Sequence, residues 1–178
     1  MNKQAAGFLS LQGQLVASWQ SVEMAVRGGD SGTPAEFDGP DVPCLQLLVL
    51  EVVMTGGATL RIGTYQDDHG FGLHIKPGSI RTTDHWDGIY RYRALTELPT
   101  GLVQDVSVHL DVDTGILAEA KVRIADHDLH LMAGEAEKTR SGALIWRTLD
   151  ESVLVFTDAS RVEEVTWAPS RGRLRRLG

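Results

Sequence analysis

A row of ionisable and hydrogen-bonding side chains can be placed on one face of two predicted hairpins. The row contains a carboxylate, a guanidinium, a phenol and an imidazole, which come from Glu51, Arg61, Tyr65 and His74. Such groups can bind a charged ligand, and an imidazole or carboxylate can also transfer protons. The structural alternative is a cross-strand ion pair of Glu51 with Arg61 on a solvated sheet face.

The turn between the first two strands decides which of these side chains meet. Apolar residues alternate on both sides of Thr55-Gly56-Gly57. A two-residue turn would mix charge with apolar residues on both faces, whereas a three-residue loop with Gly57 in the left-handed conformation and a bulge pairs Glu51 with Arg61. We adopt this second register because it collects one clean core face. That face contains Leu48, Leu50, Val52, Met54, Leu60, Ile62, Phe71, Leu73 and Ile75.

A second candidate site is the loop Asp84-His85-Trp86-Asp87, which leads into a predicted strand. It combines two carboxylates, an imidazole and an indole. An exposed tryptophan among charges is typical of a binding hot spot. Alternatively, the aspartates bind local backbone groups while Trp86 packs into the core.

Metal and cofactor chemistry finds little support in the sequence. Asp111-x-Asp113-x-Gly115 begins like a calcium loop, but Val122 stands where the closing glutamate belongs, so we interpret it as a hairpin turn. His127 and His130 would face opposite sides of a strand. Cys44 is the only cysteine, which excludes a cysteine-based zinc cluster and fits a reducing compartment. We expect no metal and no cofactor.

The elements that must hold these residues are mostly strands. Alternating or apolar segments recur at a spacing of roughly 8–12 residues, which predicts an all-β fold, an antiparallel sandwich or barrel of about ten strands. Residues 8–27 fit both a helical stripe and strand alternation, so a short N-terminal helix stays open. The later strands are predicted at 45–54, 58–66, 71–75, 89–95, 106–112, 116–125, 129–133, 143–149, 152–157 and 162–167.

Length and charge set the outer limits. With 178 residues, 42% of them hydrophobic, we expect one domain at 1–170 and a basic C-terminal tail at 171–178. We expect this tail to be frayed unless it binds an anionic partner or folds back on the acidic body of its own chain. The chain carries a net charge of −7, and the four arginines of the tail leave −11 on residues 1–170. An acidic body argues against nucleic acid. Since no apolar run is long enough to cross a membrane, we expect a cytoplasmic protein.

Two functions agree with this profile. The first is a non-enzymatic interaction module of the immunity or adaptor type, an acidic β domain whose charge suits a basic protein partner. Arginine outnumbers lysine and Asn2 is the only asparagine, which suggests a GC-rich bacterial genome. The second is a small-ligand β-barrel or enzyme in which Glu51, Arg61, Tyr65 and His74 line a cavity. An enclosed pocket at this row would favour the second function, and an open face the first.

Overall fold

The computed structural model describes residues 3–29, 32–80, 86–168, 170–172 and 174–177 of the chain. Strands dominate this part, and two short helices complete it, which confirms an all-β fold with a short N-terminal helix. In chain order the elements are α1 (Lys3–Leu9), β1 (Leu15–Met24), β2 (Leu45–Met54), β3 (Thr59–Asp67), β4 (Gly70–Pro77), β5 (Tyr90–Ala94), β6 (Gly101–Asp111), β7 (Leu117–Ile124), β8 (His127–Lys138), β9 (Leu144–Thr148), β10 (Ser152–Phe156), α2 (Ser160–Glu164) and β11 (Leu174–Leu177).

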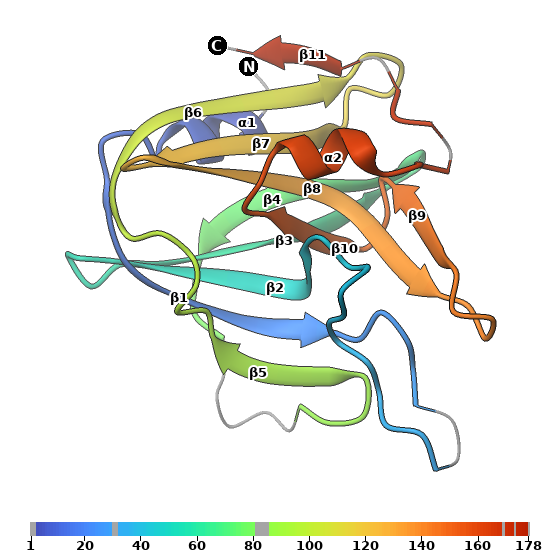
Figure 1. Ribbon diagram of the computed structural model, residues 1–178. Helices are drawn as coiled ribbons and strands as arrows, with labels where there is room; N and C mark the ends of the chain where they lie inside the picture. Colours follow the sequence, from blue (N-terminus) through green and yellow to red (C-terminus); the bar gives the residue numbers. More distant parts are fainter. Residues whose placement is uncertain (1–2, 30–31, 81–85, 169, 173, 178) are drawn as a thin grey trace.

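The strands pair antiparallel and close into a ring (Figure 1). Around this ring the neighbours are β2, β10, β8, β7, β6 and β1, and β1 returns to pair with β2. Closure depends on the first residues of β1, because Leu15 and Val16 pair with β6 while residues 20–24 pair with β5. The hairpin β3–β4 extends from β2, so β4, β3, β2, β1 and β5 form a second, open sheet.

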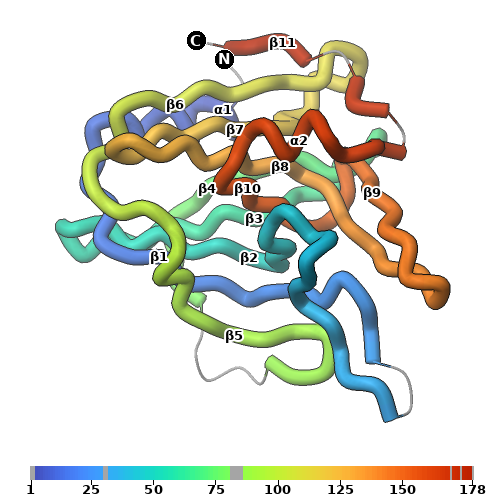
Figure 2. The backbone as a smooth tube through the Cα atoms, in the orientation of Figure 1, coloured from blue at the N-terminus to red at the C-terminus, as the bar shows by residue number. Residues whose placement is uncertain are grey.

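Apolar side chains fill the inside of the ring. Val52, Val108, Leu131 and Val153 belong to one core cluster, to which β2, β6, β8 and β10 contribute. Helix α1 packs against β4, β6 and β7, and the backbone trace shows it beside these strands (Figure 2). Its Phe8 is fully buried and belongs to the same core cluster. Because the interior is packed with side chains, ligands have to bind on the outer faces or at the edges.

The predicted register of the first hairpin is confirmed. Glu51 pairs with Arg61, and the loop contains Gly57 at a φ of 82°, in the left-handed region as expected. In the next hairpin Gly63 pairs with His74, which places His74 on the same face as Arg61. The turn chemistry around two glycines was therefore sufficient to fix which side chains share a face.

The core face of β2 differs from the prediction at its start. Val22 pairs with Val49 but Glu23 pairs with Leu47, so Leu48 is an extra residue that forms a β-bulge. The bulge reverses the facing of the residues before it. Leu47 is therefore completely buried in the ring, and Leu48, predicted there, lies on the outer face.

Of the interpretations left open for residues 8–27, the structure has a helix followed by a strand, because α1 ends at Leu9 and β1 begins at Leu15. One predicted strand near the C-terminal end is wrong. The strand predicted at 162–167 is replaced by α2, where the Asp158 carboxylate accepts hydrogen bonds from the backbone N–H and hydroxyl of Ser160 just before the helix. In the described ranges, neither helix is long and apolar enough to cross a membrane.

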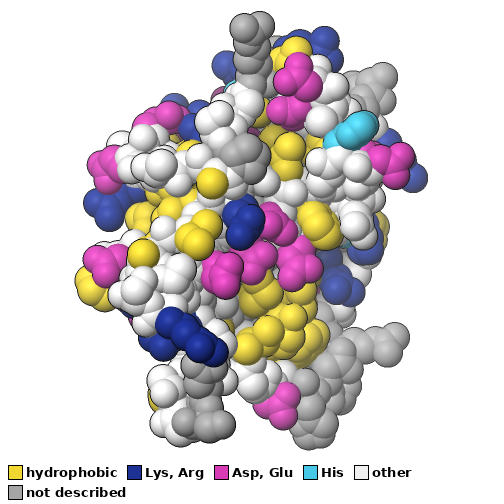
Figure 3. Space-filling model, turned by 90° about the vertical axis from the view of Figure 1, so that its right-hand side faces the viewer, with side chains coloured by type: hydrophobic (Ala, Val, Ile, Leu, Met, Phe, Trp, Pro, Cys, Tyr) yellow, Lys and Arg dark blue, Asp and Glu magenta, His cyan; other side chains and the backbone are white. Residues whose placement is uncertain are grey.

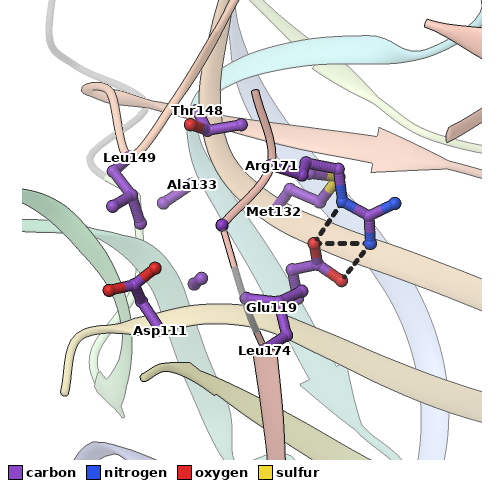
Figure 4. Close-up of a pocket in the computed structure, with 10 residues that line it drawn as sticks. Asp111, Glu119, Met132, Ala133, Thr148, Leu149, Arg171 and Leu174 are labelled. Carbon is purple, nitrogen blue, oxygen red and sulfur yellow. Dashed lines mark hydrogen bonds and ion pairs between the residues drawn. The ribbon is translucent and has the colours of Figure 1, made fainter. Parts of the chain in front are cut away.

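The C-terminal segment belongs to the sheet, so the expectation of a frayed basic tail is wrong, and the alternative of a tail folded back on the acidic body agrees with the structure. β11 pairs antiparallel with β6. Before it, Arg171 donates two hydrogen bonds to the carboxylate of Glu119, with Nε and Nη2 each 2.9 Å from an oxygen (Figure 4). Glu119 is only 2% exposed, and Nε2 of the buried His130 lies 2.8 Å from its Oε2. Burial raises the pKa of Glu119, but His130 and Arg171 outweigh burial and lower it, so the group is a carboxylate.

Removing the Arg171 guanidinium should leave the buried Glu119 carboxylate with too little opposing charge. We expect Arg171→Met to lower the free energy of unfolding by about 3 kcal/mol in urea denaturation. Arg175→Met, on an exposed position of β11, is the matched control and should change stability by less than about 0.5 kcal/mol. Equal urea midpoints for the two variants would contradict the role of this ion pair.

Acidic side chains gather on the side of the molecule formed by β8 and β9 (Figure 3). Burial raises the pKa of Glu135 on β8 to about 7, and the charges of Asp150, Glu151 and Glu137 act in the same direction. The folded state therefore holds a proton that the unfolded chain releases near pH 4.5. This contribution to stability is present at low pH and is lost as the pH rises through 7.

We expect Glu135→Gln to raise the free energy of unfolding at pH 8 by about 1 kcal/mol, which is less than the full linkage value because solvent screens this partly exposed side chain. The variant should also flatten the decrease of this free energy between pH 5 and pH 8. The measurement is urea denaturation across that pH range. Asp41→Asn removes an exposed carboxylate elsewhere and serves as the control. A variant whose stability follows the wild-type pH curve would show that Glu135 titrates normally.

Candidate functional site

The predicted row opens into a groove of about 280 Å³ on the outer face of the hairpin β3–β4. Arg61 and Lys76 pair across the two strands, and His74 stands two residues before Lys76 on the same strand, so three basic side chains share one face. Trp86, from the segment that leads into β5, closes one side. We call this the cationic groove, lined by Leu48, Val49, Arg61, Gly63, Thr64, His74, Lys76 and Trp86.

Gly63 keeps the groove open. It pairs with His74 directly across β3–β4, and it has no side chain to fill the space between Arg61 and Trp86. Even a methyl group at this position would come within 3.4 Å of Nε2 of His74. Larger side chains at Gly63 would therefore occupy the volume available to a ligand.

Unpartnered nitrogen atoms are concentrated in this groove. Among the described residues, five buried side-chain nitrogens have no hydrogen-bond partner, and three of them are Arg61 Nε, His74 Nδ1 and Trp86 Nε1. Arg61 Nε and Trp86 Nε1 can only donate, and His74 Nδ1 donates when the ring is protonated. Since buried donors are nearly always satisfied in folded proteins, this convergence leaves room for an acceptor that the described part of the chain does not supply.

The charges of the groove point to the same kind of ligand. None of the described residues that line it is Asp or Glu. Burial lowers the pKa of His74, and the charges of Lys76 and Arg61 lower it further, so the ring is neutral at pH 7. A negative charge in the groove would reverse this effect and favour the imidazolium.

Glu51 does not form the predicted ion pair with Arg61. Although the two residues are directly opposite, the ion pairs of the described part of the chain do not include them. The Glu51 side chain, 4% exposed, instead accepts a hydrogen bond from the backbone N–H of Ile80. Ile80 packs with Val49 over this face of the sheet, and it thereby separates the carboxylate from the groove.

The other predicted site residues are only partly brought together. Tyr65 shares the face but lies outside the groove, where its ring packs over Gly72 and burial raises the pKa of its hydroxyl. Trp86 lines the groove, and it also packs, partly buried, against a hydrophobic cluster that contains Val49 and Ile80, so both interpretations of this residue stay open. Asp87 is exposed, and its carbonyl accepts a turn hydrogen bond. Asp84 and His85 fall outside the described residues.

Sequence reasoning missed two contributors to the groove. Lys76 follows the alternation of β4 by two residues from His74, so the same register could have found it. Leu48 lies in the groove because the bulge in β2 turns its side chain to the outer face, and no sequence signal marks that bulge.

Compared with known proteins, the chain matches no protein-family model, no curated protein and no solved structure. The function therefore has to be argued from the groove itself.

The lowered pKa of His74 can be tested directly. In a ¹H NMR titration we expect the His74 ring to titrate below pH 6.5, and Lys76→Met should raise its pKa because one of the opposing charges is removed. Lys121→Met, on β7, should leave it unchanged. A normal pKa for His74 that is insensitive to Lys76 would mean that the two side chains are not close in solution.

Proposed function

We propose that this protein binds a small organic anion in the cationic groove. The observation that carries this proposal is the convergence of three unpartnered buried nitrogens, from Arg61, His74 and Trp86, on one cavity of about 280 Å³. A carboxylate or phosphate oxygen would accept hydrogen bonds from these groups, and charged hydrogen bonds are the stronger ones.

The walls of the groove suggest what else the ligand carries. Leu48 and Val49 provide an apolar surface, and the Trp86 indole, which contacts Tyr90 edge to face at 6.4 Å, provides an aromatic one. An anion with an apolar or aromatic body would cover these side chains while its charged end meets Arg61 and Lys76. The groove lies on an outer face and does not include Glu51, so it is not the enclosed pocket that would favour the small-ligand function by shape. We favour a small-ligand β domain because of the unpartnered nitrogens in the groove.

Binding of an anion should be coupled to protonation of His74. The surroundings of His74 favour its neutral imidazole, whereas a bound anion would favour the charged form. Binding of an anion should therefore take up a proton at His74. Affinity should therefore increase as the pH falls from 7 towards 5.5. The other function expected from the sequence, an interaction module for a protein partner, stays a prediction. It would be favoured if no small anion binds in the experiments below.

The test uses benzoate and its neutral analogue benzyl alcohol, added to ¹⁵N-labelled full-length protein. Benzoate should shift the indole N–H signal of Trp86, assigned by its loss in Trp86→Phe, in a saturable way and more strongly at pH 5.5 than at pH 7.5. Benzyl alcohol should not. Arg61→Met should weaken benzoate binding about tenfold or more, since it removes a charged donor.

Two further variants separate the groove from general charge effects. Gly63→Val keeps every cation but fills the cavity, so it should abolish binding. Arg140→Met, in the exposed β8–β9 turn, removes the same charge outside the groove and should have no effect. Equal binding of benzyl alcohol, or full affinity in Arg61→Met and Gly63→Val, would overturn the proposal.

A further inference from the structure

A second groove lies on the outer face of β6, β7 and β8, far along the sheet order from the hairpin β3–β4. Its volume is about 240 Å³, and β11 and the residue before α2 complete its rim. We call it the C-terminal groove; its lining residues are Asp105, Ser107, Lys121, Arg123, Asp128, Leu129, His130, Ala159 and Arg176. The cationic groove shares none of these residues.

The registers of the three strands arrange these side chains in two rows. The first row is Asp105, Arg123 and Asp128, in which Arg123 donates to Asp128 at 2.7 Å and 2.8 Å and is neutralised. The second row is Ser107, Lys121 and His130.

The second row holds an available cation. Lys121 takes part in none of the ion pairs found in the described ranges, and neither does Arg176, which enters from β11. Both side chains are exposed at the rim. Ser107 adds a hydroxyl beside Lys121 across β6–β7. Donors for an oxyanion thus stand in this row and at its edge.

His130 adds an acceptor. Its side chain is 1% exposed, and Nε2 lies 2.8 Å from Glu119 Oε2. Glu119 is a carboxylate, because His130 and Arg171 lower its pKa in spite of burial, and a carboxylate can only accept. Nε2 therefore carries the proton in the neutral ring, which leaves Nδ1 as a buried acceptor without a partner in the described chain.

The neighbouring His109 is the last of the buried, unpartnered nitrogens. It pairs across strands with Glu119 on one side and Arg176 on the other, and burial lowers its pKa. With this residue, every buried side-chain nitrogen that lacks a partner in the described ranges lies in the cationic groove or around the Glu119 network beside the C-terminal groove. Such atoms are rare in folded proteins, and of these two histidines only His130 lines the C-terminal groove.

We propose that the C-terminal groove binds a small phosphate ester that carries a hydroxyl group near the phosphate. Lys121, Arg176 and Ser107 donate to the phosphate oxygens, and the ligand hydroxyl donates to Nδ1 of His130. Arg171 holds the Glu119 carboxylate (Figure 4). Glu119 in turn fixes the His130 tautomer that makes Nδ1 an acceptor. The arrangement distinguishes a hydroxylated phosphate ester from the dianion of an alkyl phosphate, because only the first carries a hydroxyl that can donate to His130.

The experiment compares two probes of similar size, glycerol 3-phosphate and propyl phosphate, by ¹H–¹⁵N correlation spectra of the full chain. Glycerol 3-phosphate should cause saturable shifts at the amides of residues 107, 121, 130 and 176. Propyl phosphate lacks the hydroxyl groups, so it should bind about tenfold more weakly. Glycerol alone should not bind.

Exposed lysines provide crossed controls, since Lys121→Met and Lys76→Met remove the same charge from the two grooves. Lys121→Met should weaken glycerol 3-phosphate about tenfold and leave benzoate binding in the cationic groove unchanged; Lys76→Met should do the reverse. Ser107→Ala is a second variant of the C-terminal groove and should weaken the phosphate more mildly.

Three outcomes would overturn the proposal. They are no saturable shift at the four named amides, unchanged affinity in Lys121→Met, and equal affinity for propyl phosphate, which would remove the acceptor role of His130. None of them bears on benzoate in the cationic groove, so the two proposals can fail separately.

Discussion

The whole arrangement depends on β1 and β2 belonging to two sheets at once. Each of these strands gives one edge to the other and divides its second edge between two partners: β1 between β6 and β5, and β2 between β10 and β3. Irregularities in pairing lie where the partners change, between Val16 and Ser18 in β1 and at Leu48 in β2. A β-bulge bends and twists a strand, so these are the points at which the chain can leave the ring and enter the open sheet.

This division explains why the ligand sites are on the outside. The ring encloses a continuous apolar core, and its hydrogen bonds are used between neighbouring strands. Polar residues that alternate with the core residues have to face outwards, on the open sheet around His74 or on the ring around Lys121. Although the chain is acidic overall, these two places gather cations. Net charge therefore says little about the chemistry of an individual groove, because local potentials differ from the mean.

Sequence patterns predicted what depends on neighbouring residues along the chain. Alternation and the Gly56-Gly57 turn were enough to place Glu51 opposite Arg61 and to put His74 on the same face. They could not show that Ile80 would take the hydrogen bond of Glu51, because that contact depends on how a distant loop folds over the sheet. For the same reason the Glu119–Arg171 pair escaped detection: its partners are brought together only by the pairing of β11 with β6. The strand prediction at 162–167 was wrong for a local reason. The five residues of α2 are compatible with a helix as well as with a strand, and the Asp158 side chain before them accepts a hydrogen bond from the first backbone N–H of the helix.

The short pairing of β1 with β6 also has a consequence for the order in which the chain can fold. Leu15 is synthesised long before Leu102, its partner across the closing seam, so the ring stays open until β2, β7, β8 and β10 have found one another. Such a closure joins residues distant in sequence, for which the entropy of a large loop has to be overcome before any contact is gained. The apolar inner face of β1 is meanwhile exposed to water. A growing chain of this kind gains its last stabilising contacts late, and during that interval its unpaired strand edges are open to other chains.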